Sequence, residues 1–149
     1  MIIANVLKGV QRLGVDTAPF IYYVEDDGIY AKKMDAVIDF VEANNIPLVT
    51  STVTLLETLV KPLKESDKTV EQAYRELLST TSYLSLQPIT STVASQAATL
   101  RATYNLKTPD ALQIAATLEN GCDAFLTNDL GLKRVNELRV LVIDEMDIK

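Results

Sequence analysis

The residues of this sequence that could carry out chemistry are mainly carboxylates, because the chain contains no histidine. Without an imidazole it cannot hold a Ser-His-Asp triad, a Cys-His pair or an HExxH zinc site. The lone cysteine, Cys122, excludes a disulfide framework and a thiolate zinc cage, and we expect it to be a small core side chain. Catalysis would therefore have to use carboxylates, hydroxyls, lysines or a bound metal ion.

Polar groups gather in the segment FLTNDLGLKR, residues 125–134. An apolar pair runs into Thr127, Asn128 and Asp129, which is more polar functionality than a plain turn needs. We expect Thr127 and Asn128 to orient Asp129 or a bound water.

Three further acids lie at the end of a predicted strand or in the early turns of a predicted helix. Asp16 closes the strand-like segment RLGVDT, and Glu57 lies on the predicted helix that follows the segment VTST. Asp110 is expected in the first turn of a helix in which Thr108 is the cap and Pro109 the first residue. Four separated segments thus each contribute one acid.

The elements that must position these acids alternate along the chain between strand-like and helical patterns. Strands are predicted within residues 12–17, 46–51, 83–89, 123–128 and 138–144. Helices are predicted from Pro19 onward, over 31–42, from 52 to a stop before Pro62, and over 66–80, 93–104 and 110–119. This alternation predicts an α/β fold with a mainly parallel central sheet of four to five strands flanked by helices, as one domain over residues 1–149. Ligands of such sheets bind beyond the carboxyl ends of the strands, where the four acids are expected to meet.

Each acid taken alone also fits a structural role. The helix dipole favours Asp110 in a first turn, and Asp16 and Asp129 could simply begin loops. Glu57 interrupts an apolar run but could lie on an exposed helix face. The coincidence of four acids at one edge favours a single site.

The charge balance limits the ways in which this chain could bind a polyanion. Its net charge is −6, which argues against a broad basic face that holds nucleic acid through counterion release. Lys133 and Arg134 are candidates for phosphate contacts, and each alone also fits a solvated helix end. The sequence shows neither an amino-terminal signal pattern nor an apolar run approaching the roughly 18 residues of a membrane span. We therefore expect a cytoplasmic protein that does not contact a membrane.

The four acids lie in segments that resemble the acidic motifs of the PIN domain, in the same order along nearly the whole chain. These segments are GVDTAPFIYYVE, STVTLLETLVKP, TPDALQIAATLENG and AFLTNDLGL. Within that family the sequence is most similar to VapC-type toxins of toxin-antitoxin pairs. The resemblance implies that Asp16, Glu57, Asp110 and Asp129 form an acidic quartet that binds Mg²⁺ or Mn²⁺. It also implies that Thr127 is the accompanying hydroxyl, and we place Thr17, Thr127 and Asn128 around the metal ligands.

The function implied by this resemblance is a metal-dependent ribonuclease that hydrolyses RNA phosphodiester bonds. Such a toxin is expected to be held inactive by a small antitoxin and to form a homodimer. The segment FIYYVEDDGIY, residues 20–30, is a candidate contact surface, or alternatively part of the core. Two features depart from the family pattern: residues 1–12 form a leader before Asp16, and Ala18 stands where a second small polar residue is frequent.

Elementary metal chemistry agrees with this interpretation. Mg²⁺ prefers oxygen ligands and keeps several waters, so one or two direct carboxylates are sufficient. A bound divalent cation can acidify a water and stabilise a departing oxygen, and it offsets the charge that would repel RNA.

Other classes remain open. A receiver domain should carry an acidic pair at the first strand's end and a lysine near the last strand, and a haloacid dehalogenase phosphatase should carry Asp where Ala18 stands. The strongest rival is a PIN-like module that binds RNA or protein without catalysis, and an EDTA-controlled nuclease assay separates it from an enzyme.

Overall fold

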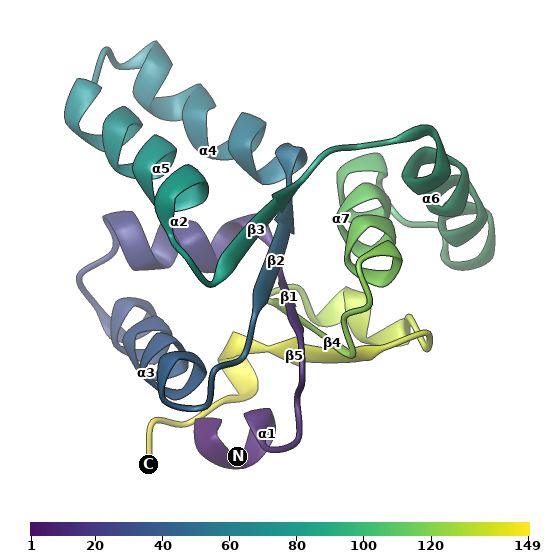
Figure 1. The fold of residues 1–149 in the computed structure, drawn as a ribbon, viewed down its shortest axis with the longest axis horizontal. Coiled ribbons are helices and arrows are strands. Elements are labelled where there is room, and N and C mark those ends of the chain that lie inside the picture. Colours follow the sequence, from purple (N-terminus) through teal and green to yellow (C-terminus); the bar gives the residue numbers. More distant parts are fainter.

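A central parallel sheet organises the computed structural model, which describes residues 1–149 (Figure 1). The strand order is β3-β2-β1-β4-β5, and every neighbouring pair is parallel. The strands are β1 (Leu13–Val15), β2 (Leu48–Ser51), β3 (Leu84–Gln87), β4 (Ala124–Thr127) and β5 (Arg139–Val142). Strands β1, β2 and β4 are buried throughout, which explains why each begins with apolar residues, whereas β2 and β4 end in hydroxyl side chains at the carboxyl edge of the sheet. The predicted α/β class and parallel sheet are confirmed.

Helices cover both faces of the sheet (Figure 1). They are α1 (Ile3–Leu7), α2 (Thr17–Glu25), α3 (Ile29–Ala43), α4 (Thr52–Lys64), α5 (Lys68–Thr80), α6 (Ser91–Tyr104) and α7 (Thr108–Glu119), with short 3₁₀ helices η1 (Leu130–Arg134) and η2 (Ile143–Glu145). Helices α6 and α7 lie on one side, and α2, α3 and α5 lie on the other. No helix in the structure has the length and hydropathy needed to span a lipid bilayer.

Alternating side chains of the strands build two separate cores. Val15 and Leu126 belong to the core under α2 and α3, whereas Phe125 points into the core under α6 and α7. Helix α7 approaches β1 very closely at Gly14, where a Cβ would lie 2.2 Å from the Thr117 side chain. Glycine is required there because the helix that carries Asp110 could not otherwise pack at this depth.

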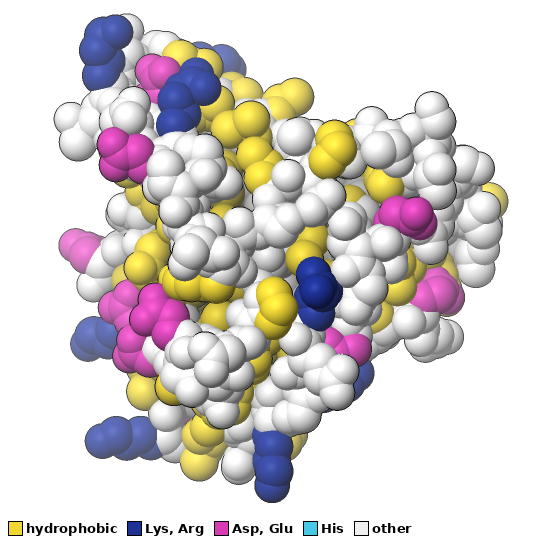
Figure 2. Space-filling model, viewed as in Figure 1, with side chains coloured by type: hydrophobic (Ala, Val, Ile, Leu, Met, Phe, Trp, Pro, Cys, Tyr) yellow, Lys and Arg dark blue, Asp and Glu magenta, His cyan; other side chains and the backbone are white.

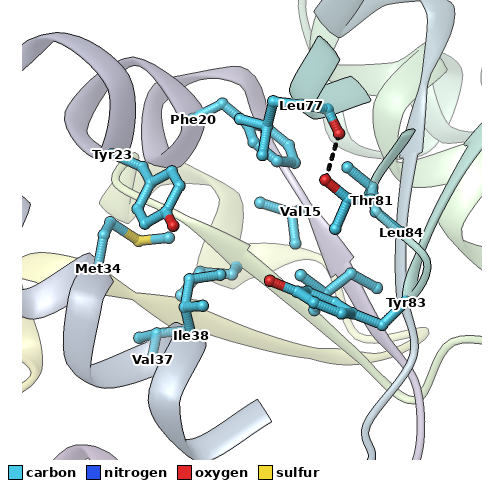
Figure 3. A pocket seen from close by; sticks show the side chains of 12 residues that line it. Val15, Phe20, Tyr23, Met34, Val37, Ile38, Leu77, Thr81, Tyr83 and Leu84 are labelled. Atoms are coloured by element: carbon cyan, nitrogen blue, oxygen red, sulfur yellow. Dashed lines mark hydrogen bonds between the residues drawn. The ribbon is translucent and has the colours of Figure 1, made fainter. Parts of the chain in front are cut away.

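The core under α2, α3 and α5 contains a small apolar cavity of about 10 Å³ (Figure 3). Eleven of its twelve lining residues are hydrophobic, and Tyr23 and Tyr83 are among them. The space is about that of one water and offers almost no polar partner, so it is a packing feature rather than a ligand site.

Three predicted element boundaries were wrong. Helix α2 begins at Thr17 rather than Pro19, because Asp16 caps it by accepting the Thr17 N–H at 2.8 Å. Helix α4 continues through Pro62 to Lys64, because Pro62 is buried in the last turns and the loss of its N–H is outweighed by packing. Thr108 does not cap α7: the N-cap position is Lys107, without a side-chain cap, and Pro109 is the second helical residue.

The leader forms part of the fold. Residues 3–7 form α1, whose side chains Ile3, Val6 and Leu7 join the core beneath α3. A parallel bridge between Ile2 and Asp147 ties the leader to the other end of the chain.

Candidate active site

Asp16 is held at the carboxyl end of β1 by bonds to both of its carboxylate oxygens. Its Oδ1 accepts the Thr17 N–H at 2.8 Å, and its Oδ2 accepts the Thr127 hydroxyl at 2.8 Å. Thr127 is completely buried at the end of the neighbouring strand β4. Parallel register thus places a hydroxyl from one strand end directly beside the carboxylate of the next.

Glu57 reaches the same edge from α4, on an exposed position of that helix. The Thr17 hydroxyl donates to Glu57 Oε1 at 2.6 Å. Thr17 therefore joins the two acids, since its N–H contacts Asp16 and its hydroxyl contacts Glu57.

Asp129 and Asp110 have far fewer partners. Asp129 caps η1 by accepting the Gly131 N–H at 2.8 Å, and its own N–H lies 3.2 Å from the Thr127 hydroxyl. The Asp110 carboxylate, in the first turn of α7, takes part in no hydrogen bond. It is half-buried, so neither bulk water nor the protein fully solvates its charge.

The pKa values of Asp16 and Asp110 respond to the charges of the other acids. Burial, and then the charges of Asp16, Asp129 and Glu57, raise the pKa of Asp110 to about 6, while Lys107 acts in the opposite direction. Burial also raises the pKa of Asp16, against the lowering effect of its bonds to Thr127 and Thr17. An acid near pKa 6 among like charges is the pattern expected where a cation or proton compensates the cluster.

The donor set suits a hard divalent cation, although it does not form a closed cage. No group of three or more acidic or cysteine side chains lies close enough to hold one ion together. Mg²⁺ accepts a site with one or two direct carboxylates and several waters, and each of the four acids offers carboxylate oxygens. The residues therefore fit Mg²⁺ or Mn²⁺ by chemistry and charge.

A buried polar network that was not predicted lies beneath Asp16 and Glu57. Its members are Thr50, Ser51, Thr54 and Gln113, each at most 2% exposed. The available signal was the unusual polar run TST at a strand end, together with a glutamine inside the apolar helix segment ALQIAATL. Buried polar groups need partners, so polar residues at these positions could have indicated a hydrogen-bonded cluster.

Three residues that were predicted to belong to the site have other partners in the structure: Asn128, Lys133 and Arg134. Asn128 donates to the Tyr22 hydroxyl and accepts the Asp144 N–H, so its bonds support neither Asp129 nor another acid. The Lys133 ammonium lies 2.7 Å from Glu145.

The Arg134 guanidinium is bound to backbone carbonyls, including that of Tyr104 at 3.0 Å. Lys107, which was not predicted, is exposed at the N-cap of α7 beside the acids.

The remaining surface offers two observations. On the face in Figure 2 the Lys and Arg side chains lie mostly apart and form no continuous basic surface. In the segment 20–30, Phe20 is buried and Tyr22 stacks on Tyr30 at 4.4 Å, while Tyr23 and Ile29 are exposed.

Comparison with known proteins connects this geometry to a family. The PIN domain model matches residues 14–138. Similar solved structures include a toxin-antitoxin complex from Klebsiella pneumoniae, with 21% identity, a TM-score of 0.64, and coverage of 88% of this chain and 97% of that chain. A DNA-bound VapBC from Salmonella typhimurium is 15% identical over 89% of this chain and 98% of that chain, with a TM-score of 0.72.

VapC20 of Mycobacterium tuberculosis, described as a Sarcin-Ricin loop cleaving toxin, is 16% identical over 85% of this chain and 98% of that chain, with a TM-score of 0.65. A search of curated proteins found no matching sequence. At these identities the structural likeness concerns the fold.

Proposed function

Because this chain belongs to the PIN domain family, we propose that it is a metal-dependent endoribonuclease and the toxin of a toxin-antitoxin pair. The observation that carries the proposal is that acids from separate elements meet at one sheet edge: Thr17 joins Asp16 to Glu57, and the Thr127 hydroxyl bonds Asp16 and accepts the Asp129 N–H. The pKa of Asp110, raised to about 6 by burial and then by the charges of Asp16, Asp129 and Glu57, agrees with this. A fold has no structural need for such a cluster of like charges at one sheet edge. It is useful when a divalent cation binds there.

In this proposal Asp16, Glu57, Asp110 and Asp129 hold Mg²⁺ or Mn²⁺, directly or through water. When bound, the ion supplies an acidified water and charge stabilisation at the scissile phosphate. The role of the protein is to fix Asp16 through Thr17 and Thr127, so that this carboxylate does not have to reorganise on binding.

The assignment as a toxin draws on the Klebsiella pneumoniae toxin-antitoxin complex and on VapC20, whose described activity is cleavage of the Sarcin-Ricin loop. We extend it to an RNA substrate, a small antitoxin partner and a homodimer, with residues 1–149 acting as one nuclease domain in the cytoplasm. The segment 20–30 remains a proposed contact surface.

The test is cleavage of total cellular RNA by purified protein in Mg²⁺, in Mn²⁺ and in excess EDTA, with the Asp110→Asn variant as a matched control. We expect cleavage only with metal and only by the unmodified chain. Equal cleavage in EDTA would exclude a metal-dependent mechanism. RNA binding without cleavage under every condition would instead favour the catalytically silent PIN-like module.

A further inference from the structure

Gln113 lies one helical turn after Asp110 on α7, and its side chain is buried beneath the acid cluster with only 2% of the residue exposed. We propose that Gln113 is a positioning residue, an inference that rests on the proposed function. Its amide directs the Thr17 hydroxyl toward Glu57 and thereby fixes Glu57 and Asp16 relative to each other.

The amide contacts several elements at once. Its Nε2 donates to the Thr54 hydroxyl oxygen at 2.6 Å and to the Thr17 hydroxyl oxygen at 3.1 Å, and it lies 3.5 Å from Asp16 Oδ1. Its Oε1 accepts the Ser51 hydroxyl at 2.5 Å. One side chain thus connects α7 with the carboxyl ends of β1 and β2 and with the start of α4.

Counting hydrogens gives the contact with Thr17 a direction. The hydroxyl of Thr17 has one hydrogen, and an ionised carboxylate can only accept. That hydrogen therefore goes to Glu57, 2.6 Å away, and the Thr17 oxygen is left to accept. Gln113 Nε2, at 3.1 Å, and the Thr54 hydroxyl, at 3.3 Å, are the donors that meet this requirement, and Gln113 also donates to Thr54 at 2.6 Å, so its amide orients both groups.

The orientation of the amide follows from Ser51 and Asp16. The Ser51 oxygen accepts the Val53 N–H at 3.2 Å, so its hydrogen is available to Gln113 Oε1. If the amide were reversed, its oxygen would face the Asp16 carboxylate and the Thr17 oxygen, which have no hydrogen to give, and only the Thr54 hydroxyl could donate to it. The chain of donors therefore runs from Ser51 through Gln113 and Thr17 to Glu57.

Packing alone does not require an amide at this position. Methionine has nearly the same length and flexibility and would fill the space between α7 and the sheet. It could not donate to Thr17 and Thr54 or accept from Ser51, however, so the Thr17 hydroxyl would lose its shorter contact from a donor and would be held toward Glu57 less firmly.

The experiment compares Gln113→Met with the unmodified chain at 25 °C, measuring kcat and KM for RNA cleavage and the Mn²⁺ concentration that gives half-maximal rate. A second readout is the rise in melting temperature that Mn²⁺ alone produces. We expect kcat to fall about 10- to 100-fold with KM nearly unchanged, a higher Mn²⁺ requirement and a smaller thermal shift.

Thr117→Val is the matched control on the same helix, because the buried Thr117 hydroxyl bonds only to the Gln113 backbone carbonyl at 2.8 Å. It should lower the melting temperature slightly and leave kcat and the Mn²⁺ dependence unchanged. If Gln113→Met does not fold, Gln113→Asn adds no charge beside Asp16 but draws the amide back by one methylene, so that it cannot reach both Ser51 and Thr17, and it is expected to show the same kind of loss.

A double variant tests whether Gln113 acts through Thr17. Thr17→Val combined with Gln113→Met should lose no more activity than Thr17→Val alone, because both break the same chain of donors. Additive losses would overturn the proposal, as would a Gln113→Met protein with normal kcat and Mn²⁺ dependence. The proposed function fails separately, if the unmodified chain neither cleaves RNA nor responds to Mn²⁺.

Discussion

The four acids of the cluster fall into two pairs that differ in how the protein holds them. Asp16 and Glu57 form a fixed pair, tied to Thr17 and Thr127 by bonds of 2.6–2.8 Å. Asp110 and Asp129 form a loose pair: Asp110 has no hydrogen bond, and Asp129 only caps its own 3₁₀ helix.

The two pairs therefore differ in how their charges affect the stability of the folded state. Asp16 is more deeply enclosed than Asp110, yet bonds from Thr127 and Thr17 counteract the effect of burial on its pKa. Asp110 lacks such bonds, and burial together with neighbouring charge raises its pKa to about 6. Hydrogen bonds from the protein stabilise the charge of the fixed carboxylate Asp16, whereas the charge of Asp110 has no such bonds.

The largest expected effect is on catalysis, where the two pairs should behave alike. Asp16→Asn and Asp110→Asn each remove a charge from the proposed metal site and should lower kcat at least about 100-fold, since even residues outside the ligand shell contribute 10–100-fold. Steady-state RNA cleavage in Mn²⁺ measures this. Near-normal activity of either variant would remove that acid from the site.

Stability without metal should separate the pairs. Asp110→Asn removes a repelled charge and should raise the free energy of unfolding by about 1 kcal/mol, or the melting temperature by about 2–4 °C. Asp16→Asn should lower the free energy of unfolding by about 1–2 kcal/mol, because its amide cannot accept from both Thr17 and Thr127 as the carboxylate does.

Urea unfolding in EDTA at pH 7 measures both changes. Parallel shifts of the same sign would show that the distinction between fixed and loose acids is unfounded. A sharp loss of stability in Asp110→Asn would identify Asp110 as a helix-start residue.

The pH dependence of stability sharpens the same contrast. Because the folded pKa of Asp110 is raised from 3.8 to about 6, the folded state binds more protons between these values. Its contribution to stability is therefore full below pH 3.8 and is lost as the pH rises through 6.

Between pH 5 and pH 7 in EDTA, the unmodified chain should lose about 1 kcal/mol more stability than Asp110→Asn, after allowance for solvent screening. Urea titrations of both proteins at the two pH values measure the difference. Identical pH dependence would mean that Asp110 titrates normally.

The fold was predictable because its sequence signals are local. The hydrogen bonds that hold the site residues in place were not predictable. Short apolar strands and the amphipathic segment 31–42 follow from periodicity, and the strand-end rule places Asp16 and Asp129 at one edge. Pro62 was misjudged because burial overrides a local helix-breaking preference. The bonds of Gln113 join segments 59 to 97 residues apart, and side-chain spacing within one helix holds no information about such partners.

The smallest effect concerns two lysines near the cluster. Lys133 was predicted to contact phosphate, but its ammonium lies 2.7 Å from Glu145, whereas exposed Lys107 has no ion-pair partner and lowers the pKa of Asp110. A free cation beside the acids is better placed to meet RNA than one already paired.

Lys107→Gln should therefore raise KM a few-fold and reduce the slope of log affinity against log salt by about 0.7, as expected for one single-strand phosphate contact. Lys133→Gln should leave both unchanged, since an exposed pair contributes at most about 1 kcal/mol and only to stability. RNA binding by each variant in Ca²⁺ at several salt concentrations distinguishes them, and a larger salt effect for Lys133→Gln would restore Lys133 as the phosphate contact.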